Sequence, residues 1–462
     1  MNKGMEKIYY KIPYQIQNLF ISLYGIYLHQ MRYGGRSDKY TEELLASQWF
    51  PKEELIELQR DRLTKLISHA YNKVPYYNEL FKTTGLSPKD IQDIFDLKKI
   101  PFLTKNTIKN SFDKLISRGP IRKKLARFHT SGTTGSPLTI ICDIDDRRRH
   151  YAFLNRLRSW YGVEMGLRRA SFYGRIIVPQ NRNRPPFWCY DVAENNYIFS
   201  SYHMTDKNLC YYYDKLLKIR PVEISGYPSS LFIVARYILA NKLPPIKPRF
   251  IMTTAETLLA QQRSIIEAAF QCAVSDQYGC TEMALFVSQC EKGNYHIHPE
   301  YGIVEVLDKK GEPVHSGEEG EVVCTSFINQ AMPLIRYQLG DIVKTSSSSC
   351  PCGRNFPVIE HIVGRSDDIL ITPDGKPLGR LDTIFKNLEG IYETQIIQTA
   401  ADCLELKIVT GRNFSDKHIN ELMYEIRKRV GIEMTVKVDK VDEIPKDRNG
   451  KFKSVLSRIN KP

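Results

Sequence analysis

The stretch HTSGTTGSPLTI, residues 129–140, gathers two glycines, a serine and three threonines within residues 130–135. Glycine lets a backbone approach a ligand closely, and the amide N–H groups of such a loop converge on an anion while hydroxyl groups add donors. This composition suits phosphate, and a plain surface turn is the alternative. No lysine follows Gly135, so the loop is not a P-loop of the G-x-x-x-x-G-K-[ST] type. We therefore expect a phosphate-sheltering loop whose stabilising cation comes from elsewhere in the chain.

The sequence on both sides of this loop predicts an α/β fold with two domains. Residues 40–120 carry apolar side chains at three- and four-residue spacing, which predicts helices, and strands alternate with helices from the loop to about residue 280. Short strands with glycine-containing turns then predict an antiparallel, barrel-like segment. We expect layered sheets and helices over residues 1–363, with residues 1–120 as a mostly helical lead-in, and a small α+β domain over residues 364–462.

The small domain is predicted in some detail. A hairpin is expected around Asp374-Gly375, strands at 404–409 and 435–441, and a helix at 416–430.

Composition narrows the class of protein. The chain has 462 residues and a formal net charge of +14, but its basic clusters are dispersed, so nucleic acid is not an expected partner. Ten cysteines without a secretory signal predict reduced thiols in a cytoplasm. The apolar stretch LFISLYGIYL, residues 19–28, is too short for a bilayer span of about 20 residues. We expect this stretch to form a helix packed on the core, with peripheral contact to a membrane surface as the alternative.

Six motifs stand in order along the chain: TSGTTGSP (130–137), TTAETL (253–258), DQYGCTE (276–282), RYQLGD (336–341), GRSDDIL (364–370) and PKDRNGKFKSV (445–455). In this order they resemble the landmarks of the adenylate-forming (acyl-adenylate/CoA ligase) superfamily. Three longer stretches are SQCEKGNYHIHPEYGIVEV, INQAMPLIRYQLGD and CPCGRNFPVIEHIVGRSDD. They carry a narrower resemblance to the phenylacetate-CoA ligase branch and, within it, to CapK-like proteins found with capsule and surface-polysaccharide genes.

The resemblance implies a two-step reaction with ATP and Mg²⁺. A carboxylate attacks the α-phosphate of ATP to give acyl-AMP and pyrophosphate, and a nucleophile then takes the acyl group and releases AMP.

The resemblance also implies roles for individual residues. Ser131, Thr133 and Thr134 contact the β- and γ-phosphates, with room given by Gly132 and Gly135; Thr281 contacts the α-phosphate; Glu282 holds Mg²⁺; Asp341 accepts the ribose hydroxyls; Arg365 reaches the ribose or phosphate; Ala255, Glu256, Tyr278 and Gly279 border the nucleotide.

The C-terminal domain supplies the missing cation by the same resemblance. Lys451 bridges the carboxylate and the α-phosphate during adenylation, and Lys446 and Lys453 are its rivals. Since the small domain of the superfamily rotates between the half-reactions, Asp367 is expected at the hinge and the domain is expected to be mobile.

A second constellation has metal-like spacing. Cys290, His296, Cys350 and Cys352 supply the four Cys/His ligands that zinc prefers, and the CapK-like group has similar positions. Reduced, buried cysteines are the alternative, and His298 is a rival for His296. A zinc ion here would be structural.

The acyl substrate is a small carboxylic acid whose identity the sequence does not give. The resemblance implies a pocket lined by Tyr173, Gly226, Tyr227 and Pro228. Coenzyme A is the expected acceptor, and the amine of a sugar or amino acid is the alternative. A non-catalytic scaffold in polysaccharide assembly is the competing class of function, and a homodimer is one option for the oligomeric state.

Overall fold

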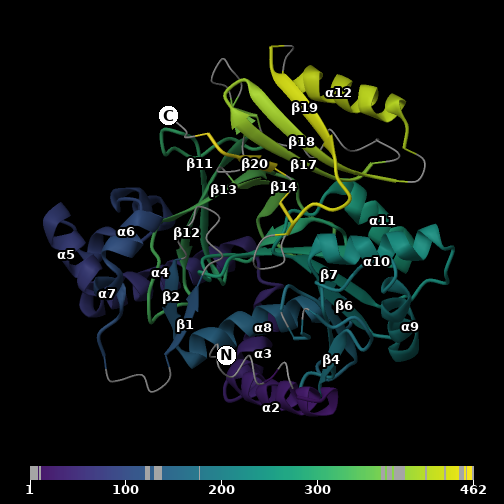
Figure 1. Cartoon of the computed structure of the whole chain (residues 1–462). Helices are drawn as coiled ribbons and strands as arrows, with labels where there is room; N and C mark the ends of the chain where they lie inside the picture. Colours follow the sequence, from purple (N-terminus) through teal and green to yellow (C-terminus); the bar gives the residue numbers. More distant parts are fainter. Residues whose placement is uncertain are drawn as a thin grey trace.

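The computed structural model describes residues 9, 12–119, 125–129, 138–175, 177–179, 181–365, 370–371, 377–378, 391–411, 414–430, 433–446, 452–453 and 455–459. Among the helices of these residues, none combines the length and the apolar character needed to cross a lipid bilayer. The expected fold class is confirmed: a large α/β part carries a smaller α+β part at its C-terminal end (Figure 1).

One large sheet forms the frame of the described N-terminal part. Its strands are β3 (Arg169–Phe172), β4 (Trp188–Asp191), β5 (Asn196–Phe199), β6 (Glu223–Gly226), β7 (Phe250–Thr254), β8 (Val274–Gly279), β9 (Phe286–Gln289), β10 (Tyr295–Ile297), β11 (Gly302–Leu307), β12 (Glu319–Ser326), β13 (Tyr337–Thr345) and β14 (Val358–Arg365). Their order is β11-β12-β13-β14-β10-β9-β8-β7-β6-β3-β5-β4. Strands β5, β3, β6, β7 and β8 are parallel to one another, and the strands from β9 to β11 continue the sheet in antiparallel fashion.

Helices cover both faces of the parallel strands. The helices of this region are α8 (Ile144–Trp160), α9 (Leu209–Ile219), α10 (Pro228–Ala240) and α11 (Ala260–Phe270). Successive residues of a strand point to opposite faces. Accordingly, Ile251 of β7 packs in the core under α9, α10 and α11, whereas Phe250 and Met252 pack in the core that includes α8. The apolar run Phe250–Met252 at the start of β7 fits this burial on both sides.

The lead-in helices lie at the antiparallel end of the sheet (Figure 1). They are α4 (Lys52–Lys73), α5 (Pro75–Thr84), α6 (Lys105–Asn110) and α7 (Phe112–Leu115), with the 3₁₀ turns η1 (Pro88–Asp90) and η2 (Ile94–Lys99). Helix α3 (Ser37–Ser47) instead packs beside α8 (Figure 1). Helices α4 and α5 share a core with strands β11 to β13. The antiparallel pair β1 (Ala126–His129) and β2 (Thr139–Cys142) flanks the glycine-rich loop, and β2 contributes Ile140 and Ile141 to that core.

The C-terminal part has a core of its own. Strands β17 (Ile391–Ala400), β18 (Cys403–Thr410), β19 (Thr435–Lys440) and β20 (Val455–Ser457) form a sheet in the order β19-β18-β17-β20, on which α12 (Asp416–Val430) packs. The short strands β15 (Leu370–Ile371) and β16 (Pro377–Leu378) pair antiparallel, and residues 372–376 between them lie outside the described residues. The expected strands and helix of this domain are therefore confirmed, and the antiparallel pair agrees with the expected hairpin.

The N-terminal helix differs from the sequence expectation. Helix α2 (Tyr14–Tyr33) forms as predicted, yet its buried residues are Gln17, Gly25 and Met31, and most of the apolar side chains of residues 19–28 face outward. The helix packs on the protein as expected, but most of the apolar side chains of this stretch do not reach the core, so that part of the expectation is wrong. The physical reason is that α2 meets the edge strand β4, whose free backbone groups bind polar side chains.

Candidate active site

Neighbouring parallel strands end at one edge of the sheet, and the predicted site residues follow those ends. Strands β3, β6, β7 and β8 are in register, and ligands of open α/β sheets bind outside the carboxyl ends of such strands. The residues brought to this edge are Tyr173 after β3; Gly226, Tyr227 and Pro228 at the end of β6; Ala255 and Glu256 after β7; and Gly279, Thr281 and Glu282 at and after the end of β8.

The predicted acyl wall is tightly built. Gly226 lies opposite Phe172 in the β3–β6 ladder, and a Cβ added to it would stand 2.7 Å from the Phe172 carbonyl oxygen. The Tyr227 amide donates to that same oxygen at 3.0 Å. The rings of Tyr173 and Tyr227 then meet edge to face, with centroids 5.6 Å apart. Burial raises the pKa of the Tyr173 phenol, so the wall presents neutral aromatic surface. Pro228 begins α10 at the position where a missing N–H costs nothing.

Glu256 joins the two parts of the chain. Its carboxylate accepts hydrogen bonds from the Ser229 amide (3.0 Å), the Ser229 hydroxyl (3.1 Å) and the Phe452 amide (2.6 Å). Ser229 lies in the first turn of α10, where a carboxylate is favourably placed. Burial raises the pKa of Glu256, while these donors act in the opposite direction. Because Phe452 belongs to the C-terminal part, Glu256 links the loop after β7 to the predicted lysine loop.

Asp341 and Glu282 are each held by a tyrosine. Asp341 on β13 is only 9 % exposed, and its Oδ2 accepts from the Tyr278 hydroxyl at 2.7 Å. Burial, and then the neighbouring Asp341, raise the pKa of Tyr278 well above its usual value, which keeps the phenol a donor. The buried Glu282 accepts from the Tyr337 hydroxyl at 3.1 Å, while Thr281 beside it is exposed.

Several predicted site residues lie outside the part of the chain that the structure describes. Ser131, Gly132, Thr133, Thr134, Gly135, Asp367 and Lys451 lie outside the described residues, and of Arg365 only the backbone is described. That backbone pairs with Asp341 across the β13–β14 ladder. The hairpin that carries the glycine-rich loop is fixed to the large domain by Asn329, which donates to the Ile141 carbonyl at 2.8 Å.

The four predicted metal ligands converge. One potential ligand atom from each of Cys290, His296, Cys350 and Cys352 lies within 4.8 Å of all the others. The Sγ atoms of Cys290 and Cys350 are 3.5 Å apart, and Cys352 Sγ is 3.4 Å from His296 Nε2. Ligands about 2.0–2.3 Å from one zinc ion in a tetrahedron lie roughly 3.5–3.8 Å from each other, so the set fits zinc. Burial lowers the pKa of His296 to about 4, which favours the neutral imidazole that a metal requires.

The structure separates His296 from its rival. His298 donates or accepts at Ser288 Oγ (2.8 Å) through Nε2, and its Nδ1 contacts the Arg156 guanidinium. Arg156 also forms a fully buried ion pair with Glu300, whose Oε1 accepts from Ser47 at 2.7 Å. Both ring nitrogens of His298 are therefore engaged in this network, and His296 is the histidine of the cysteine cluster.

The cluster lies beside the strand that leads to the predicted hinge. Cys350 and Cys352 precede β14, and β14 pairs with β10, on which His296 lies. Arg354 reinforces this junction through an ion pair with Glu291 at 3.0 Å. A metal ion here would join the loop after β9 to the loop before β14, which is a structural role.

Sequence reasoning missed several supporting residues. Tyr337, Ser229 and Phe452 hold the predicted carboxylates, and Thr253 and Tyr295 bind the buried Asp276 under the site at 2.6 and 2.7 Å. A signal for some of them was present, because Tyr337 stands inside RYQLGD and Thr253 inside TTAETL. The pairing of each tyrosine with its carboxylate spans many residues and has no local sequence signal.

Comparisons with known proteins agree with this geometry. The CapK C-terminal domain family matches residues 370–458. Protein CapK of Staphylococcus aureus is 30 % identical over 462 residues, covering 98 % of this chain and 100 % of the relative. The phenylacetate-coenzyme A ligase of Thermus thermophilus is 25 % identical over 441 residues, covering 88 % and 97 %. A crystal structure of 2-hydroxyisobutyryl-CoA ligase in the postadenylation state with R3-HIB-AMP superposes with a TM-score of 0.72 at 18 % identity, covering 88 % and 90 %, which shows a shared fold.

Proposed function

The chain belongs to the CapK family, and from that premise we propose that it is an AMP-forming ligase that activates a carboxylic acid with ATP and transfers the acyl group to coenzyme A. In the first step a carboxylate oxygen attacks the α-phosphorus, and the bond to pyrophosphate breaks. In the second step the thiolate attacks the acyl carbonyl, and AMP leaves. A place in surface-polysaccharide biosynthesis rests on the resemblance to CapK-like proteins alone.

The observation that carries the proposal is the convergence of two carboxylates on one strand edge. Asp341 and Glu282 come from segments about 60 residues apart and are both buried beside β8, each fixed by a tyrosine hydroxyl. A buried carboxylate offers two acceptor oxygens, which suits two different tasks here. Asp341 would accept the ribose hydroxyls, and Glu282 would hold Mg²⁺, which supplies charge neutralisation on the phosphates when bound.

The acid and the lysine loop have their places in the same proposal. The Tyr173–Tyr227 corner supports a binding wall for the hydrocarbon part of the acid. The Phe452–Glu256 hydrogen bond supports an adenylation geometry in which Lys451, the residue before Phe452, acts on the α-phosphate. Positioning and electrostatics are the expected sources of rate acceleration for this step.

Pyrophosphate release over a panel of carboxylic acids tests the proposal. We expect release that requires an acid, ATP and Mg²⁺, and a loss of at least about tenfold in Glu282→Gln. Glu312→Gln, in an exposed turn, is the matched control. No release with any acid would favour a scaffold. In an active enzyme, the mass of the product with coenzyme A or an amino sugar distinguishes thioester from amide formation.

A further inference from the structure

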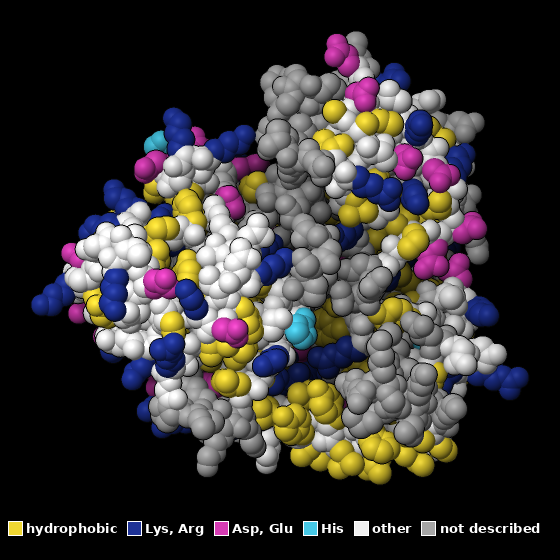
Figure 2. Space-filling model, turned by 60° about the vertical axis from the view of Figure 1, so that its left-hand side comes forward, with side chains coloured by type: hydrophobic (Ala, Val, Ile, Leu, Met, Phe, Trp, Pro, Cys, Tyr) yellow, Lys and Arg dark blue, Asp and Glu magenta, His cyan; other side chains and the backbone are white. Residues whose placement is uncertain are grey.

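An apolar ridge runs along the outward face of α2. Seven large apolar side chains of this helix are 42–58 % exposed, among sixteen such exposed side chains in the described part of the chain. They are Ile16, Leu19, Phe20, Leu23, Tyr24, Ile26 and Tyr27. Figure 2 shows apolar side chains gathered along the lower edge of the molecule, and α2 lies at that edge in Figure 1, far from the C-terminal part. A patch of this kind marks an interaction surface.

The opposite face of α2 meets the protein through polar side chains. Ser22 donates to the Tyr190 carbonyl at 3.1 Å, and the Asn18 side chain accepts from the Tyr190 amide at 2.8 Å, so α2 binds the exposed edge of β4. Gln17 is fully buried. A Cβ added to Gly25 would overlap the Asp191 carboxylate, so the helix backbone lies directly against the end of β4.

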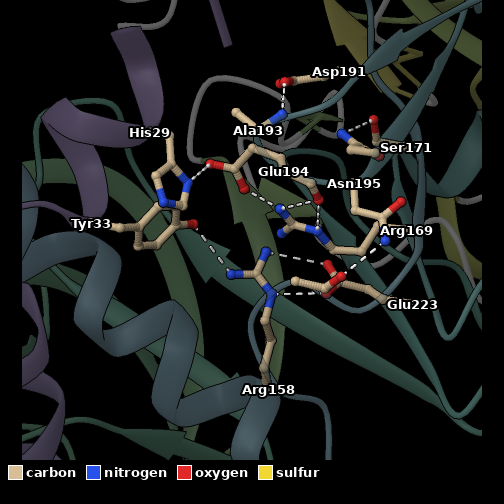
Figure 3. A network of polar contacts seen from close by, with 12 residues as sticks. His29, Tyr33, Arg158, Arg169, Ser171, Asp191, Ala193, Glu194, Asn195 and Glu223 are labelled. Atoms are coloured by element: carbon tan, nitrogen blue, oxygen red, sulfur yellow. Dashed lines mark hydrogen bonds and ion pairs between the residues drawn. The ribbon is translucent and has the colours of Figure 1, made fainter. Parts of the chain in front are cut away.

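Buried charges fix this orientation. From α2, His29 contacts Glu194 at 3.3 Å and Tyr33 accepts from Arg158 at 3.4 Å (Figure 3). Glu194 is also paired with Arg169, and Arg158 is paired with Glu223 at 2.8 Å. Rolling the helix to bury its apolar face would take the His29 and Tyr33 contacts away from the buried Glu194 and Arg158, which is costly. The apolar ridge therefore faces outward by construction.

The charges around the ridge indicate what covers it. Helix α2 contains no acidic residue, and Arg32 lies in its last turn. Arg148, within the run 147–149 of α8, reaches the Gln30 carbonyl of α2, and Lys and Arg side chains lie beside the patch in Figure 2. Basic residues next to an apolar helix face complement anionic lipid headgroups, and tyrosine favours the depth where headgroups meet acyl chains.

We propose that α2 lies in the interface of an anionic membrane, with its apolar ridge among the acyl chains and its polar face bound to the protein. A lipid surface can contact all seven side chains of this exposed helix face, whereas a protein partner would need a groove of matching shape. None of the described helices is long and apolar enough to cross a bilayer, and the proposed association is therefore peripheral. Glu223, which pairs with Arg158 beneath α2, lies on strand β6, and β6 ends at the predicted acyl wall. The predicted site would therefore be held at a fixed distance from the membrane surface.

Sedimentation with vesicles tests the proposal on the full chain. We expect binding to vesicles of phosphatidylcholine mixed with phosphatidylglycerol, weaker binding to phosphatidylcholine alone, and loss of binding at high salt. Combined replacement of Leu19, Phe20, Leu23 and Tyr24 by Ser should lower the partition coefficient by about a hundredfold or more.

A matched control has the same chemistry elsewhere. Tyr211, Leu217, Leu239 and Tyr424 are 41–66 % exposed on other helices, and their combined replacement by Ser should leave vesicle binding unchanged. Equal losses in both variants would overturn the proposal. A wild-type chain that stays in solution with the mixed vesicles would also overturn the proposal. If, in addition, light scattering shows a wild-type dimer that the α2 variant converts to a monomer, a second copy of the chain covers the ridge instead. Thermal unfolding of both variants identifies a misfolded protein.

Discussion

The hydrogen bond between Glu256 and Phe452 gives the sharpest prediction for the mechanism. Replacing Glu256 by Ala removes the acceptor of the Phe452 amide, which lies 2.6 Å from Oε1. In the described residues this bond ties the segment next to the predicted catalytic lysine to the nucleotide side of the large domain. The change should therefore loosen the docking of the lysine loop.

The expected size of the effect follows from the loss of one part-buried hydrogen bond to a carboxylate. A hydrogen bond to a charged group contributes about 1.5–3 kcal/mol, so its loss lowers the docked population by roughly 10- to 150-fold. If docking is required only for adenylation, pyrophosphate release at saturating ATP should fall by that factor. Thioester formation from supplied acyl-AMP should change by less than about threefold.

The control separates docking from the other contacts of Glu256. Ser229→Ala removes only the hydroxyl bond within the large domain, at 3.1 Å, and keeps the bond to Phe452. It should lose less than about fivefold in either half-reaction. A higher KM for ATP with unchanged turnover would instead assign Glu256 to adenine binding. Equal loss of both half-reactions in Glu256→Ala would refute the docking argument.

Three further predictions concern the cysteine–histidine cluster, the buried Arg156–Glu300 ion pair and the predicted ribose site. Cys350→Ser should abolish stoichiometric zinc in elemental analysis and lower the melting temperature, whereas Cys210→Ser, outside the cluster, should do neither; wild-type protein without zinc would contradict the site. Arg156→Met strands a fully buried carboxylate and should cost about 3–5 kcal/mol in denaturant unfolding, a cost below about 1 kcal/mol being incompatible with the ion pair. Tyr278→Phe removes the 2.7 Å bond to Asp341 and should raise the KM for ATP by about tenfold; an unchanged KM would separate Asp341 from nucleotide binding.

The candidate site was predictable in its parts and unpredictable in its connections. The landmarks RYQLGD and DQYGCTE each contain one tyrosine and one carboxylate that matter, yet the bonds run between the motifs: Tyr278 binds Asp341, and Tyr337 binds Glu282. A motif reports the residue types that a loop requires. Which side chain holds which depends on β13 and β8 being brought together, and that is a property of the sheet.

The choice between two histidines illustrates the same limit. His296 and His298 are two residues apart with similar neighbours, so spacing assigns neither to the metal cluster. The structure decides because Ser288 and Arg156 occupy the two ring nitrogens of His298.

By itself the sequence determined the element types, the α/β class, the small C-terminal α+β unit and the family to which the motifs point. These follow from local periodicity and from residue types at short spacing, which act within a few residues of the chain. The tertiary structure alone decided which face of α2 meets the protein, that His296 and not its rival His298 joins the predicted cysteines, and that Glu256 reaches Phe452 across about 200 residues. The amphipathic pattern of α2 predicts an apolar face and a polar face, but it does not predict which face contacts the protein. The polar face does so because the edge of β4 and the buried charges behind it bind its polar side chains.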